Sequence, residues 1–170
     1  MKSFILTSLV VVFAFTSSLQ AQFAVEAGFN SNGAKVELLG ISETSSGDGE
    51  VYFGASYDIS LSDKMSLQPA LLYSRDAFQI PVSLKLAVGS SFHVMAGPSI
   101  LMITGDETEG FNNNAIGYNA GVSLKLSDKL AIIVRYAGDL GNRLDDDGSS
   151  ILGDVSIKYS QLKAGLSYSF

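Results

Sequence analysis

The chain has 170 residues, of which 46% are hydrophobic, with no cysteine and a formal net charge of −6. The lack of cysteine excludes a disulfide framework. The acidic balance argues against a nucleic-acid partner, because phosphate binding depends on clustered lysine and arginine. The length fits one domain once the first segment is set aside.

The first 21 residues have the composition of a secretory signal peptide. Lys2 precedes an apolar run from Phe4 to Phe15, and small and polar residues follow as far as Ala21. The apolar run is shorter than the roughly 20 residues that a membrane-spanning helix needs. We therefore predict a signal peptide over residues 1–21 and one exported domain over residues 22–170.

Eight segments with the two-residue period of a β-strand follow in the exported domain. In each segment one face is apolar and carries no charge, while the other is mostly Gly, Ser and Ala with an occasional charged residue. An uncharged apolar face suits lipid, since a Lys or Arg at mid-depth costs roughly 2–4 kcal/mol, and small residues suit the lumen of a narrow barrel. The segments are 23–30, 51–61, 66–73, 78–88, 92–103, 116–126, 130–137 and 161–170.

The connections between these segments differ in length. Outer-membrane barrels have short turns on the periplasmic side and longer loops outside, and an even number of strands puts both termini in the periplasm. The pattern therefore predicts an all-β fold, an eight-stranded antiparallel up-and-down transmembrane β-barrel. Short connections cover 62–64, 74–77, 89–91 and 127–129, and the predicted external loops cover 31–50, 105–114 and 141–154.

Aromatic residues on the apolar face fall into two bands. Two aromatic girdles are typical of a barrel that crosses both membrane interfaces, whereas the core of a soluble sandwich predicts no such banding. The predicted girdle at the short-turn rim comprises Phe23, Phe92, Tyr168 and Phe170, and that at the opposite rim comprises Phe29, Phe53, Tyr73, Phe78, Tyr118 and Tyr136.

The chain resembles the small eight-stranded outer-membrane β-barrels, of the OmpX- and OmpA-like kind. The stretch "FQIPVSLKLAVGSSFHVMAGPSI" from Phe78 is similar to the central hairpin of the porin-like outer-membrane β-barrel domain family, and "LKAGLSYSF" ends in Phe170 like the signal read by the barrel-assembly machinery. The resemblance implies a Gram-negative outer-membrane protein in contact with lipid and lipopolysaccharide, without a cofactor. It also implies a non-enzymatic membrane-structural or surface-interaction role through the external loops.

Three prolines depart from this strand pattern. Pro69, Pro81 and Pro98 each remove a hydrogen-bond donor from a predicted strand, which puts the local register in doubt.

Charged side chains on the small-residue face allow two interpretations. They could line a pore, or they could pair with one another and plug the lumen, because buried charges require partners. An eight-stranded barrel is only just wide enough for its own side chains, so we favour the plug and predict that Glu26 pairs with Lys163 or Arg135. The predicted lumen charge network comprises Glu26, Asp58, Lys85, Lys125, Arg135 and Lys163.

Apolar residues also occur on the same face. They could line a lipid or small-ligand pocket, fill the lumen, or indicate a register slip, since a one-residue shift exchanges the two faces. These residues are Leu72, Met95, Leu101, Ile103 and Ile133.

Candidate catalytic and metal-binding residues are few. His93 with a nearby serine could act as a base in a lipid-modifying enzyme, but a histidine at the rim without a role fits its position better. The Gly-x-Ser pattern recurs on four segments, at Ser56, Ser99, Ser123 and Ser167, which favours packing over catalysis. The acidic run 145–147 lacks the ligand spacing of an EF-hand. We predict no catalytic residue, metal site or cofactor.

Three other functions stay as alternatives to the surface role. They are a lipid-modifying outer-membrane enzyme, a narrow pore, and a soluble lipocalin-like barrel whose apolar face would turn inward to hold a small ligand. The lipocalin alternative predicts a protein that stays soluble without detergent.

Overall fold

A computed structural model describes residues 21–38, 41–75, 77–104, 112–143 and 155–170. The predicted signal segment 1–20 therefore lies outside the described residues. In the described ranges no helix is long and apolar enough to cross a membrane. The strands are β1 (Ala21–Leu38), β2 (Ile41–Ser62), β3 (Met65–Ser74), β4 (Ala77–Ala87), β5 (Phe92–Ile103), β6 (Asn114–Lys125), β7 (Leu130–Asp139) and β8 (Val155–Ser169).

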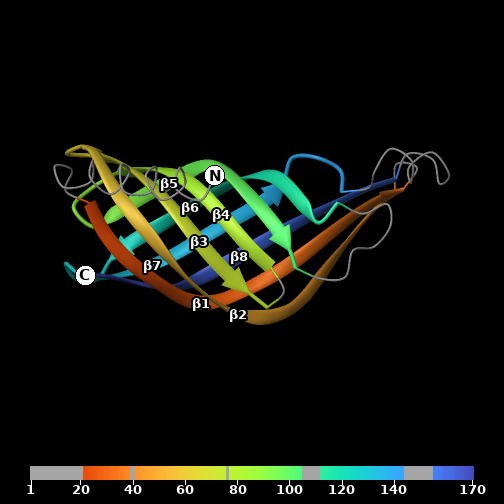
Figure 1. Ribbon diagram of the computed structural model, residues 1–170, viewed down its shortest axis with the longest axis horizontal. Coiled ribbons are helices and arrows are strands. Elements are labelled where there is room, and N and C mark those ends of the chain that lie inside the picture. The colour runs from red at the N-terminus through yellow and green to blue at the C-terminus, as the bar shows by residue number, and fades with distance from the viewer. Residues whose placement is uncertain (1–20, 39–40, 76, 105–111, 144–154) are drawn as a thin grey trace, which may run out of the picture.

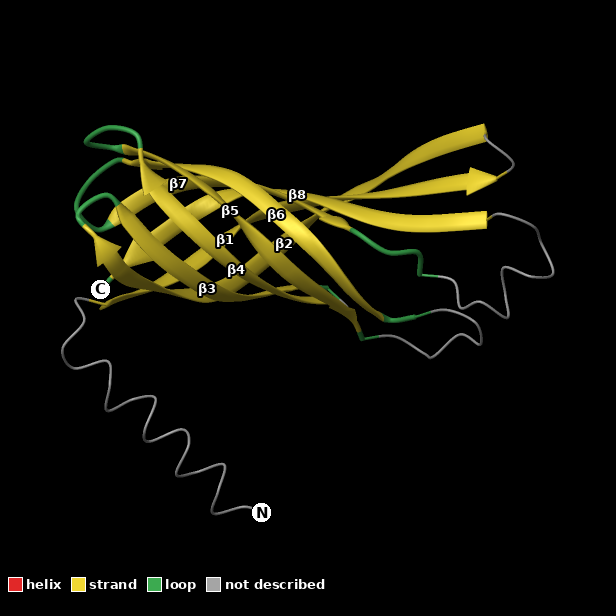
Figure 2. Ribbon diagram, turned by 90° about the horizontal axis from the view of Figure 1, so that it is seen from above, coloured by secondary structure: helices red, strands yellow, loops and turns green. Residues whose placement is uncertain are grey.

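The eight strands form one closed antiparallel barrel in chain order (Figure 1). Pairing of β1 with β8, from Ala24↔Ser169 to Leu38↔Val155, closes the sheet. The start of β1 and the C-terminus lie at the end of the barrel with the short turns, where the Phe170 amide donates to the Phe23 carbonyl at 3.0 Å (Figure 2). We call this the short-turn end and the opposite one the long-loop end. The predicted fold class is confirmed.

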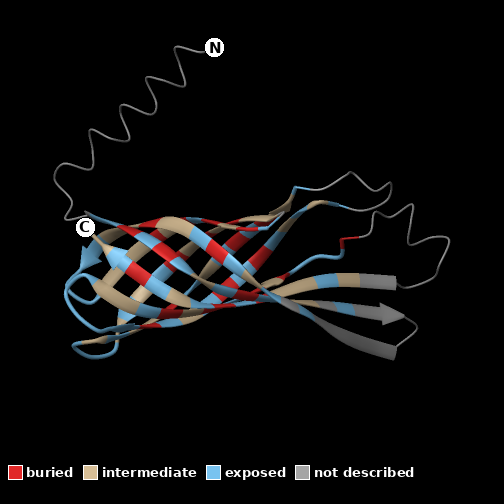
Figure 3. Ribbon diagram, turned by 90° about the horizontal axis from the view of Figure 1, so that it is seen from below, coloured by how far each residue is buried: buried red, intermediate tan, exposed pale blue. Residues whose placement is uncertain are grey.

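The distribution of polar residues is inverted relative to a soluble protein. Glu26, Asn30 and Arg135 are buried, whereas Phe29 and Ile116 are 69% and 68% exposed. Buried and exposed positions alternate along the strands (Figure 3). An apolar outer wall needs lipid around it, and a closed barrel leaves no unpaired strand edge in that lipid. The structure is that of a transmembrane barrel.

The predicted loop 31–50 is wrong. β1 continues to Leu38 and β2 begins at Ile41, and the two strands pair along this length with one irregularity between Ser31 and Gly33. With the start of β8 they form a three-stranded sheet that projects past the long-loop end of the barrel (Figure 2). We call it the projecting sheet. These strand extensions could not be recognised from the sequence, because strands outside lipid need no apolar face. The alternation of apolar and polar residues therefore stops there.

The other two predicted loops lie partly outside the described residues. Residues 105–111 and 144–154 are not described, and they include the acidic run 145–147. β6 begins at Asn114, the last residue of one predicted loop.

The three prolines lie within strands and shift no register. Pro69, Pro81 and Pro98 occur on the neighbouring strands β3, β4 and β5. The ladders β2–β3, β3–β4 and β4–β5 each skip two residue pairs beside a proline and then continue in the same register. A missing donor thus interrupts hydrogen bonding locally without exchanging the inner and outer faces.

Ring contacts join members of each predicted aromatic band. At the short-turn end, the ring centroids of Phe23 and Phe170 are 5.8 Å apart and those of Tyr168 and Phe170 are 5.3 Å apart. Phe92 is also exposed at that end of β5. Toward the long-loop end the pairs are Phe53–Tyr73 at 5.3 Å, Tyr73–Phe78 at 4.9 Å and Tyr118–Tyr136 at 6.1 Å. Such contacts stabilise the outer wall beyond the area they bury.

Candidate functional site

The centre of the lumen holds a buried ion pair. Arg135 on β7 donates from Nη1 to Glu26 Oε2 on β1 at 3.1 Å, and the side chains are 1% and 0% exposed. A second nitrogen of Arg135, Nη2, lies 3.5 Å from the other carboxylate oxygen, so the pair is bidentate. Glu26 therefore contacts Arg135, one of the two partners predicted for it.

The other predicted partner, Lys163, bonds elsewhere. It is 2% exposed, lies beside Arg135 in the β7–β8 register, and donates to the side-chain oxygen of Gln161. Among the described residues it forms no ion pair. Arg135, rather than Lys163, lies next to the Glu26 carboxylate.

A second charged group occupies the lumen near the short-turn end. Asp58 on β2 accepts from Lys85 Nζ at 2.9 Å, Gln68 Nε2 at 3.1 Å and Ser66 Oγ at 3.2 Å. Gln68 also accepts from Arg135 Nη2 at 3.4 Å. The amide of Gln68 thus links the two charged groups into one hydrogen-bonded network.

Lys125 does not join this network. Its side chain is exposed at the end of β6 and makes no ion pair within the described part of the chain, so its predicted place inside the network is wrong. It lines an open cavity at the short-turn end, together with Lys85 and His93. Lys125 is the last residue of its strand, where the lumen already opens to solvent.

His93 lies on β5 near the short-turn end, as predicted. It faces Ser123 across the β5–β6 ladder. Its Nδ1 atom is buried and has no hydrogen-bond partner among the described residues. A catalytic base bonds the hydroxyl of its nucleophile, and Nδ1 makes no such bond to Ser91 or Ser123.

Apolar side chains also lie inside the barrel, between the polar groups. Leu72, Met95, Leu101 and Ile133 are at most 8% exposed, and Ile103 is half-buried at the end of β5. They face inward in an unbroken register, so the register slip is excluded as their explanation.

Glycines on the inner face leave room for long side chains. A methyl group on Gly165 would lie 2.6 Å from the hydroxyl of Tyr52, and one on Gly54 would lie 2.7 Å from Leu72. The recurrent Gly-x-Ser pattern therefore serves packing. Its four serines all point into the lumen and are at most 9% exposed: Ser56, Ser99, Ser123 and Ser167.

The long-loop end of the lumen carries an ion pair that the sequence did not reveal. Arg143 donates from Nε and Nη2 to the carboxylate of Asp139 at 2.6 and 3.1 Å. It also donates to the backbone carbonyls of Asn112 and Asn113 at 3.3 and 3.2 Å, and the Tyr159 amide donates to Asp139 at 3.0 Å. Arg143 belongs to the predicted external loop 141–154, and no pattern in the neighbouring sequence marks it as buried.

Uncharged polar residues inside the barrel also bond one another. Ser83 donates to Asn119 at 2.6 Å, and Gln79 donates to Ser99 at 3.1 Å. These residues were on the predicted inner face, but the predicted contacts there joined charged residues only. In the part of the chain that the structure describes, no group of three or more His, Cys, Asp or Glu residues could hold a metal ion.

The arrangement of strands matches solved membrane barrels. No protein-family model matches the chain, and no curated protein matches it either. The structure of Ail, the attachment invasion locus protein of Yersinia pestis, in complex with the heparin analogue sucrose octasulfate, superposes with a TM-score of 0.55 at 12% identity, over 88% of this chain and 99% of that chain. The chain has the fold of the small eight-stranded outer-membrane β-barrels.

Two further structures have a similar fold. Neisserial surface protein A has 17% identity and a TM-score of 0.49 over 88% of this chain and 99% of that one. A de novo designed transmembrane β-barrel has 13% identity and a TM-score of 0.49, over 88% of this chain and 95% of that one. At such identities the likeness concerns the fold alone, so function has to be argued from this chain's own surfaces.

Proposed function

We propose that the chain is an integral outer-membrane protein of Gram-negative type that binds a partner outside the cell without catalysing a reaction. Residues 1–21 direct export, the termini and short turns lie in the periplasm, and the projecting sheet lies outside. The apolar wall, the projection of β1, β2 and β8 past one end of the barrel and the shared fold with Ail support this proposal.

The observation that carries the proposal is the open edge of the projecting sheet. β2 pairs with β1 along the whole projection, but β3 begins to pair with β2 only at Tyr52. The backbone of residues 41–51 on that side therefore has no strand partner among the described residues. An open strand edge binds an extended peptide by adding it as a further strand.

The opposite edge of the projecting sheet is blocked. On β8, the Ile157 amide donates to the side chain of Asn142 at 2.8 Å, and the Ile157 carbonyl accepts from the Arg143 amide at 3.1 Å. The Tyr159 amide is bonded to Asp139. The segment after β7 thus bonds backbone groups of β8 at one edge of the projecting sheet, while the β2 edge stays open. A partner strand would therefore add beside β2.

The lumen supports a closed barrel rather than a pore. Its network runs from Lys85 through Asp58, Gln68 and Arg135 to Glu26, and buried apolar residues fill the space beside it. Planar-bilayer recording tests this part of the proposal: we expect no discrete conductance steps, and steps of reproducible size would refute a plugged lumen.

Two contacts inside the envelope belong to the same proposal. The outer wall contacts membrane lipid and lipopolysaccharide, and the C-terminal Phe170, which is 69% exposed, is available to the barrel-assembly machinery. Replacement of Phe170 by Ser should lower the amount of folded barrel in the membrane, measured by heat-dependent gel mobility. An unchanged amount would remove Phe170 from assembly.

Cell attachment tests the surface role. Cells that display the chain are placed on surfaces coated with casein, an unfolded protein with free backbone, or with heparin. The acidic chain disfavours a sulfated polysaccharide, so we expect retention on casein and none on heparin.

A trimmed variant provides the matched comparison. Residues 34–45 are replaced by Asn-Gly, which closes a two-residue hairpin between the paired residues Gly33 and Ser46. We expect retention on casein to disappear while the barrel remains folded. Equal retention by the trimmed variant would overturn strand addition, and protection of the full hairpin from protease added to intact cells would overturn its external location.

A further inference from the structure

The lumen opens at the short-turn end into a polar cavity. Its volume is about 250 Å³. The short turns 62–64 and 127–129, which both have the sequence Ser-Asp-Lys, line its rim. Gln68 and Ile133, both buried, line its inner end. Beyond them lies the buried Glu26–Arg135 pair. The cavity is therefore a blind pocket that a small molecule could enter from one side.

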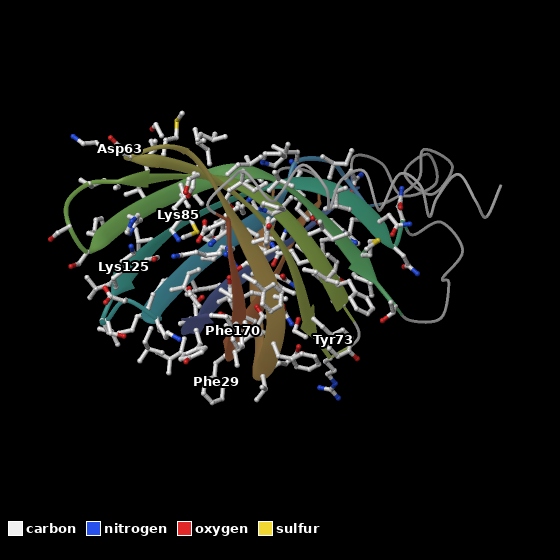
Figure 4. All side chains as sticks on the ribbon, turned by 60° about the vertical axis from the view of Figure 1, so that its left-hand side comes forward. Phe29, Asp63, Tyr73, Lys85, Lys125 and Phe170 are labelled. Atoms are coloured by element: carbon white, nitrogen blue, oxygen red, sulfur yellow. The ribbon has the colours of Figure 1, made fainter. Side chains whose placement is uncertain are left out.

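Among the side chains that line this cavity, two lysines and the histidine come from three adjacent strands. Lys85 is on β4, His93 on β5 and Lys125 on β6. His93 pairs with Ala87 and with Ser123, which lie two residues from Lys85 and Lys125 respectively. His93 is thus the diagonal neighbour of both lysines, a spacing at which long side chains reach one another. Figure 4 shows Lys85 and Lys125 at the end of the barrel that carries Asp63, and both line the cavity.

The carboxylate deepest in this cavity already has its partners. Asp58 accepts three hydrogen bonds, from Lys85, Ser66 and Gln68. Lys125 has no ion-pair partner within the described residues, and Lys85 uses one of the three donors of its ammonium on Asp58. The rim turns add two aspartates and two lysines, Asp63, Lys64, Asp128 and Lys129, so the whole lining has four lysines against three aspartates. The cavity is therefore slightly positive, although the chain as a whole is acidic.

Hydroxyl groups surround Lys85, His93 and Lys125. Ser123 and Ser167 are buried in the wall, and further serines lie at the rim. Hydroxyls donate to oxyanions and also bond the hydroxyls of a polyol. A phosphomonoester has close to two negative charges near neutral pH and three acceptor oxygens, which matches two ammonium groups and several hydroxyls better than a single carboxylate does.

We propose that this cavity binds a small phosphomonoester, with the phosphate group held between Lys85 and Lys125 beside His93. The volume exceeds that of a phosphate group alone, so a polar alcohol such as a sugar fits next to the serines. This inference concerns the cavity and does not depend on the surface role proposed above.

The single histidine of the chain provides the test. The ring signals of His93 are followed by NMR in maltoside micelles, which contain no phosphate, at constant pH and ionic strength. Inorganic phosphate and glucose 6-phosphate are added in separate titrations, with acetate and chloride as anion controls. We expect saturable shifts with both phosphates, tighter for glucose 6-phosphate because the serines contact the sugar, and no saturable shift with acetate or chloride.

Two variants of the exposed Lys125 make the test specific. Lys125→Gln should weaken glucose 6-phosphate binding by about tenfold or more, the effect of losing one charge-assisted hydrogen bond. Lys125→Arg should keep binding within a few-fold. Lys158→Gln is the matched control, because Lys158 is an exposed lysine on the projecting sheet at the opposite end of the barrel. It should leave binding unchanged.

Three results would overturn the proposal. They are the absence of a saturable shift with either phosphate, an equal response to acetate, and equal affinity in Lys125→Gln. Because Lys125 is exposed, its replacement should leave the barrel folded, and unchanged heat-dependent gel mobility verifies this.

Discussion

The barrel and the projecting sheet are built from the same strands but obey different rules. Inside the barrel, β1 and β2 alternate between an uncharged apolar face and a lumen where Glu26 is fully enclosed. Past the barrel, the same two strands continue to Leu38 and from Ile41 in a polar sequence with an open edge. Lipid and the closed lumen impose alternation and pairing, while water imposes neither. The comparison separates the part that carries stability from the part available for binding.

The largest difference should appear on breaking the central ion pair. Glu26→Ala leaves Arg135 charged and buried, which should cost about 3–5 kcal/mol of unfolding free energy. Urea unfolding in micelles and heat-dependent gel mobility measure this loss. The paired replacement Glu26→Leu with Arg135→Met should recover most of it, because no lone charge then remains. A single variant as stable as the wild type would show that the pair does not hold the barrel.

A charge on the outer wall should have the next largest effect. Ala120→Lys lies on the lipid face at the middle of β6 and should cost roughly 2–4 kcal/mol. Val51→Lys lies near the start of the projecting sheet and should cost roughly 0–1 kcal/mol. Unfolding in lipid vesicles compares the two variants. Equal costs would contradict the boundary that we place between barrel and projecting sheet.

Close packing inside the lumen predicts a smaller effect. In Gly165→Ala the added methyl group would lie 2.4 Å from the Ala27 carbonyl oxygen and close to Tyr52, so overpacking should cost about 1–3 kcal/mol. Gly89→Ala at a short turn meets no atom within 4 Å and is the control. Unfolding midpoints that fall equally in both variants would mean that the lumen can expand.

The smallest effect on stability should come from the projecting sheet itself. Replacing residues 34–45 by Asn-Gly removes no buried lumen contact of the barrel, so the unfolding free energy should change by about 0.5 kcal/mol or less. Thermal and urea unfolding of the trimmed variant provide the measurement. A loss of several kcal/mol would mean that the projection is part of the folded core.

Much of the barrel could be predicted from sequence because lipid and lumen impose a strict period of two. The inner and outer faces of the eight predicted segments, and the need of Glu26 for a cationic partner, follow from that period and from the requirement that buried charges have partners. Which of Arg135 and Lys163 is that partner does not follow from the sequence. The prolines put the local strand register in doubt, since a missing hydrogen-bond donor can shift a ladder. Here the flanking pairs hold the register.

The parts that could not be predicted lie where those constraints end. Residues 31–50 are rich in Ser, Gly and Glu, and only their pairing with β8 and with each other makes them strands. Arg143 is buried and donates hydrogen bonds to the backbone carbonyls of Asn112 and Asn113. No sequence pattern predicts that these residues lie close to Arg143. Lys125 has the inward parity of a lumen residue, but its position at the strand end exposes it.

The central ion pair joins residues 109 positions apart in the chain, on the first and the seventh strand. Pairing of β8 with both β1 and β7 places these strands on either side of β8. A sheet that has inserted but not yet closed would therefore leave two unmatched charges near lipid, which is energetically unfavourable. The Glu26–Arg135 contact therefore stabilises the closed barrel and not an open sheet.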